Sequence, residues 1–176
     1  MPESEYKLDM VSVRLVPDAP ILSDHKIITK EDAVAVMKEL LSEMDRELLC
    51  IINLRSDGTP INGHIVSMGA INQTIVNPRE LFKAAILSNA AGMIMLHSHP
   101  SGDASPSKQD VIVTDKMIHA CELMGIPLLD HIIVGGNTKE QFSFRENSML
   151  HPAELDLKSE CRELEFGRRG LRLHKR

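Results

Sequence analysis

The amino-acid sequence predicts an α/β sandwich, in which a mixed β-sheet is covered by helices. Segments whose apolar residues recur at helical spacing alternate along the chain with short apolar runs that are bounded by turn residues. With 176 residues and a hydrophobic content of 43%, the chain can fill one core without disulfides. We therefore expect one domain over residues 29–150, between an N-terminal arm (1–28) and a charged C-terminal tail (151–176).

The first predicted elements are a strand and a helix. Apolar residues alternate over residues 11–16 of the arm, which favours a short edge strand. Thr29 is expected to cap a helix, with Asp32 at the reciprocal position of a capping box. The apolar residues of that helix at helical spacing are Ala33, Met37, Leu40, Leu41 and Met44.

The later elements alternate between strands and helices. In chain order we expect a strand at 48–54, a turn at 56–60, one or two strands within 62–76, a helix from Asn77 or Pro78, a strand at 93–96, a helix from Ser107 to Met124, and strands at 127–134 and 141–144. The inner faces of the second and third helices are predicted to be Leu81, Phe82, Ala85 and Ile86, and Val111, Thr114, Ile118 and Cys121, respectively.

Composition argues against several classes of protein. The formal net charge of −5 gives no overall basic field that would attract nucleic acid. The three cysteines are far apart, so neither a disulfide framework nor a thiolate zinc site is indicated, and Cys50 and Cys121 are expected in the core. The acidic start lacks the apolar segment of a signal peptide, and no run reaches the roughly 18 apolar residues of a membrane span. The expected compartment is the cytoplasm.

The most informative segment joins the strand at 93–96 to the helix that follows it. His97 and His99 stand two positions apart, so an extended backbone points both imidazoles to one side. Residues 100–106 are rich in Pro, Gly and Ser, and allow the chain to turn back so that Asp110 can reach the same point. Two imidazole nitrogens and one carboxylate are a ligand set of catalytic zinc sites, which keep a fourth position open.

Helix capping is an alternative role for part of this segment. Ser107 and Asp110 have the spacing of a capping box, in which each side chain satisfies a backbone N–H at the start of the helix. Capping accounts for this pair but not for the histidines. The sequence leaves both roles open for Asp110, as ligand or cap, and for Ser107, as site residue or plain N-cap.

The run from His97 to Asp110 fits the pattern H-[ST]-H-P-x6-S-x2-D at every fixed position. In this run the chain resembles the JAMM (MPN+/JAB) metalloprotease family. The wider segment His99-Pro100-Ser101-Gly102-Asp103 is similar to the RadC-like JAB branch of that family. Ser98 departs from the Asn that RadC-like proteins often have between the two histidines, and follows the wider JAMM pattern.

Three further segments carry the resemblance to the RadC-like branch. They are Asn77-Pro78-Arg79-Glu80-Leu81-Phe82, the segment 129–135 (LDHIIVG), and Phe142-Ser143-Phe144. With them, the resemblance extends roughly from Ile28 to Leu150. It implies a three-layer JAB/MPN domain whose layering is akin to that of the cytidine deaminases.

The resemblance also implies an activity, that of a zinc-dependent metallopeptidase or isopeptidase-like hydrolase. Its Zn²⁺ would be held by His97, His99 and Asp110, and a metal-activated water would attack an amide bond of a protein or peptide substrate. In the family, the serine that Ser107 matches stabilises the developing oxyanion. A glutamate upstream acts as general acid and base.

Glu47 is the best match to the family's upstream glutamate, which stands at the start of an early strand. It lies between the first predicted helix and the strand at 48–54. Glu39 and Glu43 suit the role less well, because their spacing puts them on the helix. The alternative for Glu47 is a solvated loop carboxylate.

The other polar residues of interest are expected to be structural. Asp130 and His131 belong to a segment similar to the family, and are predicted to support the sheet or the metal ligands. His64, His119 and His151 have no partner at ligand spacing and are predicted to be structural or exposed.

Three alternative functions come from other classes. RadC-like proteins carry a label of DNA repair, which would make this chain a DNA-repair-associated accessory or binding protein. Its nucleic-acid contact would depend on the basic residues after Glu165 or on a partner. A metal-free scaffold is disfavoured because all the expected ligands are present. A zinc nucleobase deaminase would need H-x-E and P-C-x-x-C, and the sequence has neither.

Overall fold

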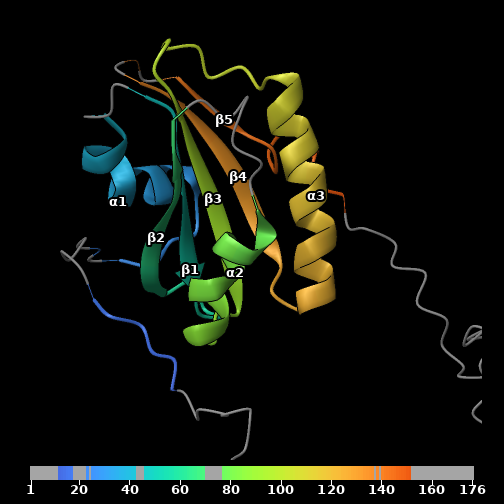
Figure 1. Cartoon of the computed structure of the whole chain (residues 1–176). Helices are drawn as coiled ribbons and strands as arrows, with labels where there is room; N and C mark the ends of the chain where they lie inside the picture. The colour runs from blue at the N-terminus through green and yellow to red at the C-terminus, as the bar shows by residue number, and fades with distance from the viewer. Residues whose placement is uncertain are drawn as a thin grey trace, which may run out of the picture.

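The chain folds around one β-sheet with helices on both faces (Figure 1). The structure, a computed structural model, describes residues 12–17, 23, 25–42, 46–69, 77–136, 138 and 140–151, with the side chains of 38–42 excepted. Its elements are α1 (Lys30–Ser42), β1 (Leu48–Leu54), β2 (Pro60–Met68), α2 (Pro78–Leu87), β3 (Gly92–His99), α3 (Lys108–Met124), β4 (Leu128–Gly135) and β5 (Gln141–Ser143).

The five strands stand in the order β2-β1-β3-β4-β5. β3 and β4 run parallel, and the other neighbouring pairs run antiparallel. Because parallel neighbours cannot be joined by a tight turn, the chain crosses over between β3 and β4 through α3. The mixed sheet confirms the predicted fold class.

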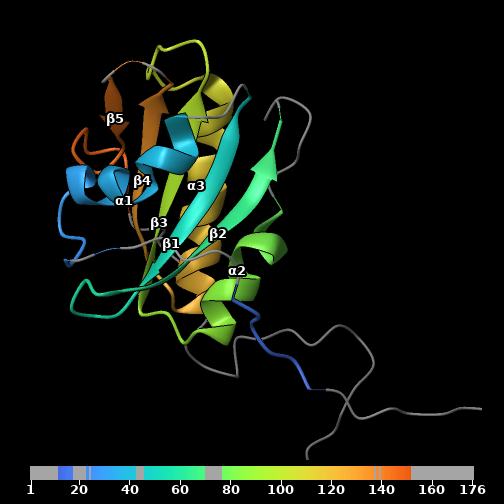
Figure 2. The same ribbon diagram turned by 90° about the vertical axis from the view of Figure 1, so that its left-hand side faces the viewer.

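The sheet is the middle layer of three, with α1 on one face and α2 and α3 on the other (Figures 1 and 2). Successive residues of a strand point to opposite faces, so in β1 Leu48 packs in the core with α1, and Leu49 in the core with α2 and α3. β3 alternates in the same way, and Met95 faces α2 and α3. His97 and His99 have the parity of Met95, and therefore lie on the α3 face of the sheet.

The predicted start of the first helix is confirmed. The backbone N–H of Thr29 donates to Oδ2 of Asp32 over 2.8 Å, and the N–H of Asp32 donates to Oγ1 of Thr29 over 3.2 Å. Ala33 and Met37 are buried as expected, whereas Leu40, Leu41 and Met44 fall outside the described side chains. A reciprocal cap thus orients α1 so that its apolar residues meet the sheet.

The predicted core positions of Cys50 and Cys121 are also confirmed. Both are buried free thiols, and burial raises the pKa of each to about 12. The strand expected within 62–76 is β2, which ends at Met68, while residues 70–76 lie outside the described part. Among the helices that the structure describes, none combines the length and apolar character of a membrane span.

Two predictions about apolar residues were wrong. The alternation at 11–16 does not form an edge strand: residues 12–17 have no regular structure and no neighbouring strand, and Val16 is 82% exposed. On the helices, Ile86 and Val111 are exposed instead of facing the core, whereas the other residues predicted for the inner face of α2 (Leu81, Phe82 and Ala85) are buried.

The error at Val111 has a physical cause, because the inner face of α3 begins with the polar Asp110. Thr114 and Cys121 are buried as predicted. Ile118 is only partly buried. The buried residues of α3 are Asp110, Val113, Thr114, Met117 and Cys121.

We expect Leu96→Ala, in the middle of β3, to lower the free energy of unfolding by about 2–5 kcal/mol, because it removes a fully buried side chain and leaves a cavity. The matched control is Leu123→Ala, at a leucine that is 70% exposed, which should stay within about 0.5 kcal/mol of wild type. Urea denaturation measures both. Equal effects of the two substitutions would contradict this description of the core.

Candidate metal centre

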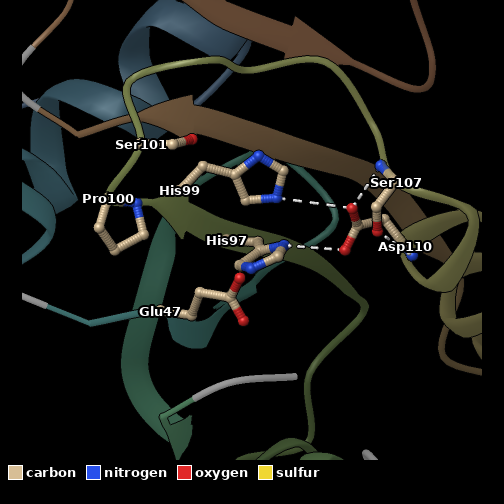
Figure 3. Close-up of a pocket in the computed structure, with 7 residues that line it drawn as sticks. All are labelled: Glu47, His97, His99, Pro100, Ser101, Ser107 and Asp110. Carbon is tan, nitrogen blue, oxygen red and sulfur yellow. Dashed lines mark hydrogen bonds and ion pairs between the residues drawn. The ribbon is translucent and has the colours of Figure 1, made fainter. Parts of the chain in front are cut away.

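Three potential metal ligands converge where β3 ends and α3 begins (Figure 3). β3 extends beyond the predicted 93–96 and includes both histidines, and His97 is only 1% exposed. Nδ1 of His97 lies 3.1 Å from Oδ1 of Asp110, and Nε2 of His99 lies 3.5 Å from Oδ2. One potential ligand atom of each residue lies within 4.8 Å of the others. The structure thus brings together the three residues that the sequence singled out as ligands.

The ring nitrogens of the two histidines suit a bound cation. Nδ1 of His99 is 2.8 Å from the backbone oxygen of Asp103, which can only accept a hydrogen bond, so Nδ1 carries a proton. In a neutral His99, Nε2 then points a lone pair at the carboxylate of Asp110, an arrangement that calls for a proton or a cation between them. Neither ring nitrogen of His97 makes a hydrogen bond to any residue that the structure describes. A neutral His97 has one acceptor nitrogen, so this buried acceptor and the Nε2 lone pair of His99 fit a metal ion.

The electrostatics of the trio keep its carboxylate ionised. Burial by itself raises the pKa of Asp110, but contacts with His97, His99 and Ser107 outweigh it and hold that pKa well below its usual range. The carboxylate of Asp110, in turn, accepts a hydrogen bond from the protonated imidazole of His99 and so raises the pKa of His99. A metal ion would therefore compete with a proton at His99, and would meet an ionised ligand at Asp110.

Asp110 also caps α3, so the two roles left open by the sequence are compatible. The backbone N–H of Ser107 donates to Oδ2 of Asp110 over 2.7 Å, and the N–H of Asp110 donates to Oγ of Ser107 over 3.2 Å. This capping box leaves Oδ1 of Asp110 beside His97. The hydroxyl of Ser107 accepts one hydrogen bond in the cap and keeps its own proton available to donate.

A cavity of about 250 Å³ opens over the trio. It is lined by Glu47, His97, His99, Pro100, Ser101, Ser107 and Asp110. Figure 3 shows the side chain of Glu47 extending toward His97 from the strand beside β3. The sequence identified five of these lining residues as site residues and assigned Pro100 and Ser101 only to shaping the loop.

Strand pairing brings Glu47 to the cavity. β1 runs antiparallel to β3 with Leu49 opposite His97, so the residue just before β1 lies beside the end of β3. The backbone oxygen of Glu47 accepts a hydrogen bond from Gly69 over 2.8 Å, which fixes this corner. Glu39 belongs to α1, on the opposite face of the sheet, and Glu43 lies outside the described residues.

The loop behind His99 is packed against two glycines at the end of β4. A Cβ at Gly135 would stand 2.2 Å from the backbone oxygen of Gly102, and a Cβ at Gly136 would stand 3.1 Å from that of His99. The hydroxyl of Thr138 also lies 2.8 Å from the oxygen of Gly102. Only small residues at 135 and 136 allow this approach, which holds the ligand loop in place.

A buried polar pair stands behind the ligands. Oγ1 of Thr114 lies 2.6 Å from the backbone oxygen of Asp110 and 2.7 Å from Nδ1 of His131. Burial lowers the pKa of His131 to about 3, so this ring is neutral. The sequence placed His131 in support of the sheet or the ligands, but treated Thr114 only as a core residue. Its spacing of four residues from Asp110 was the available signal.

The remaining residues singled out by the sequence lie apart from the trio. Asp130 is buried and accepts hydrogen bonds from Oγ of Ser143 and the backbone N–H of Arg145, so it supports the sheet at β5. His119 and His151 are exposed and His64 is partly exposed on β2. None of these three histidines belongs to the metal-ligand cluster of the described chain.

We expect His131 to make the metal-free protein less stable as pH falls. The unfolded chain binds a proton at this residue below about pH 6.5, whereas the folded protein does so only near pH 3, so stability is lost between these values. Compared with His131→Gln, wild type should lose up to about 1.4 kcal/mol of unfolding free energy per pH unit. Denaturant unfolding with chelator at pH 7 and pH 4.5 measures the difference. A gap between the two proteins that does not change with pH would refute this.

Comparison with known proteins places this site in a family. The family model described as RadC-like JAB domain matches residues 27–149. A UPF0758 protein of Methanosarcina acetivorans is 42% identical over 110 residues, which are 62% of this chain and 48% of that protein. A UPF0758 protein of Desulforamulus reducens is 43% identical over 107 residues, 61% of this chain and 47% of that protein.

A third relative, a UPF0758 protein of Protochlamydia amoebophila, is 38% identical over 130 residues, 74% of this chain and 55% of that protein. The chain therefore spans about half the length of the curated relatives it matches. The family match covers the whole sheet, both histidines and the start of α3. The chain belongs to the RadC-like JAB domain family.

Proposed function

We propose that this protein is a zinc-dependent metallopeptidase or isopeptidase-like hydrolase, which cleaves an amide bond in a protein or peptide. The observation that carries the proposal is the meeting of a His-His-Asp trio with Glu47 and Ser107 around one cavity, in a JAB domain. The five residues come from three separate parts of the chain: the start of β1, the end of β3 and the start of α3.

His97, His99 and Asp110 are the residues that would hold the metal ion. Two imidazoles and one carboxylate suit zinc, with a position left open toward the cavity. A bound zinc ion supplies a Lewis acid and lowers the pKa of a coordinated water. The ring nitrogens of His97, which make no hydrogen bond to a described residue, and the ionised Asp110 beside them are the features of this chain that fit such an ion.

Glu47 and Ser107 have complementary tasks in this proposal. The carboxylate of Glu47 faces the cavity, where it can accept a proton from the attacking water and pass one to the leaving amine. The hydroxyl of Ser107 is held by the backbone N–H of Asp110 and can donate to the oxyanion that develops on the substrate carbonyl. The DNA-associated alternative stays a prediction, because the basic residues after Glu165 lie outside the described part.

Elemental analysis of purified protein should find about one zinc per chain, and about none in His97→Ala or Asp110→Ala, since two remaining ligands hold zinc weakly. His119→Ala is the matched control, because His119 is an exposed histidine away from the trio, and it should retain the metal. Wild-type protein that takes up no zinc after reconstitution would overturn the metal centre.

Peptide hydrolysis tests the proton-transfer role of Glu47. Glu47→Gln should keep zinc but lower kcat by about 10²–10⁴-fold, because the amide cannot exchange the proton. Ser107→Ala should lower kcat by about 10²–10³-fold and also cost about 0.5–2 kcal/mol of stability through the lost cap.

Ser105→Ala is the matched control for Ser107→Ala, because Ser105 lies in the same loop but does not line the cavity. It should leave kcat unchanged. Activity of Glu47→Gln equal to wild type, with zinc present in both proteins, would remove Glu47 from the proposal.

A further inference from the structure

A buried hydrogen-bonded chain links the third ligand to the sheet. It runs from the backbone oxygen of Asp110 through the hydroxyl of Thr114 to Nδ1 of His131, with separations of 2.6 and 2.7 Å. Thr114 is 2% exposed and His131 is 1% exposed, so water does not replace these bonds. These two hydrogen bonds thus join α3 to β4 next to the candidate metal centre.

The donors and acceptors fix the direction of both hydrogen bonds in this series. The backbone oxygen of Asp110 can only accept, so Thr114 gives it the single hydroxyl proton. Thr114 must then accept from His131, which places the ring proton on Nδ1. Nε2 of His131 is left as a buried acceptor without a hydrogen-bond partner among the described residues. An apolar pair would avoid this cost, so fold stability alone does not account for the arrangement.

His131 also contacts the ring system of the site. Its ring stacks on Phe144, with centroids 4.7 Å apart and an angle of 9° between the planes. It lies nearly parallel to the ring of His97, with centroids 6.3 Å apart and an angle of 15°. His131 therefore contacts the surroundings of two of the expected ligands. It reaches Asp110 through the hydroxyl of Thr114, and its ring lies beside that of His97.

The ligands depend on such support because they come from different elements. His97 and His99 are part of the sheet, whereas Asp110 belongs to a helix that packs on it. Apart from the contacts of Asp110 with the two histidines, the Thr114–His131 bond is the side-chain hydrogen bond that joins the described residues of α3 to the sheet. A small shift of the helix would move Asp110 away from the histidines.

We propose that Thr114 and His131 are positioning residues, which set the place of Asp110 relative to His97 and His99 and so tune metal affinity. The hydroxyl-to-carbonyl bond within α3 is a common habit of threonine in helices. What goes beyond that habit is the buried imidazole on a neighbouring strand, which fixes the same hydroxyl. This inference rests on the metal centre of the proposed function, but not on peptidase activity.

The zinc affinity of the 176-residue chain, measured by competition with a chromophoric chelator, tests the proposal. Thr114→Val removes the hydroxyl at nearly constant volume and should weaken zinc binding about 10–100-fold, as loss of a residue that orients ligands does. Thr114→Ser keeps the hydroxyl and should bind zinc as wild type does. His131→Phe keeps a ring against Phe144 but not the donor, and should weaken binding as Thr114→Val does.

The double variant Thr114→Val/His131→Phe should bind zinc about as tightly as the single variant with the lower zinc affinity. Both changes break the same hydrogen bond, so their effects should not add. Thermal melting of the metal-free proteins is measured alongside, since a purely structural role would lower the melting temperature and leave zinc affinity unchanged. That result, or equal losses in Thr114→Val and Thr114→Ser, would overturn the proposal.

The remaining outcomes are also decisive. If Thr114→Val does not fold, His131→Phe tests the same bond from the strand side. Failure of both to fold, while Thr114→Ser folds, would show a structural role and overturn the proposal. Wild-type protein without zinc would refute the metal centre itself, whereas a zinc-binding wild type with unaffected variants would refute only the positioning role.

Discussion

Burial of the central strands on both faces is the constraint that the rest of this structure depends on. β1 is buried along its whole length, and β3 until its last residue, so a polar group can be placed there only where the strands end. The end of β3, the start of β1 and the start of α3 meet at one end of the central strands. Strand parity then points His97 and His99 to the side on which α3 packs, and the cavity opens at this meeting point.

Charge balance at that point is the second constraint. Asp110 is 2% exposed, and a buried carboxylate is costly unless other groups compensate its charge. The helix cap supplies backbone N–H groups, the N-terminus of α3 supplies a favourable dipole, and the histidines supply polar contacts. The ring nitrogens of His97 make no hydrogen bond to a described residue, so these buried polar atoms are not satisfied by the protein alone. A divalent cation is a group that would satisfy the acceptor among them.

Local sequence signals predicted most of the fold. The caps at Thr29 and Ser107, the apolar run of β1 and the turn residues around α2 each act over a few neighbours, and the structure has them where the sequence indicated. The predictions failed where the structure of a segment depends on another segment that packs against it. The alternation at 11–16 has no strand to pair with, and the inner stripe of α3 starts at a polar residue because the site lies there.

The residues of the site also divide into those that local spacing indicates and those that tertiary packing brings together. His97, His99 and Asp110 stand in one short segment, so their spacing indicated a ligand set, whereas the site role of Ser107 was suggested by the family resemblance. Glu47 is remote in sequence and reaches the cavity through the register of β1 with β3, which only a family pattern could suggest. The contact between Thr114 and His131 joins a helix and a strand 17 residues apart, and it follows from how α3 docks on the sheet. Pairings of this kind depend on tertiary packing, and no local spacing encodes them.

The double use of Asp110 explains why the segment is so compact. Oδ2 serves the helix cap and Oδ1 faces His97, so the residue that caps α3 also completes the candidate metal-ligand trio. Because the cap and the helix dipole both favour the charged form, they lower the affinity of this carboxylate for a proton, which would compete with a metal ion. Helix initiation and metal binding therefore favour the same ionised state at one residue. A fold that starts its helix correctly thereby also places an ionised carboxylate where it could serve as a third metal ligand.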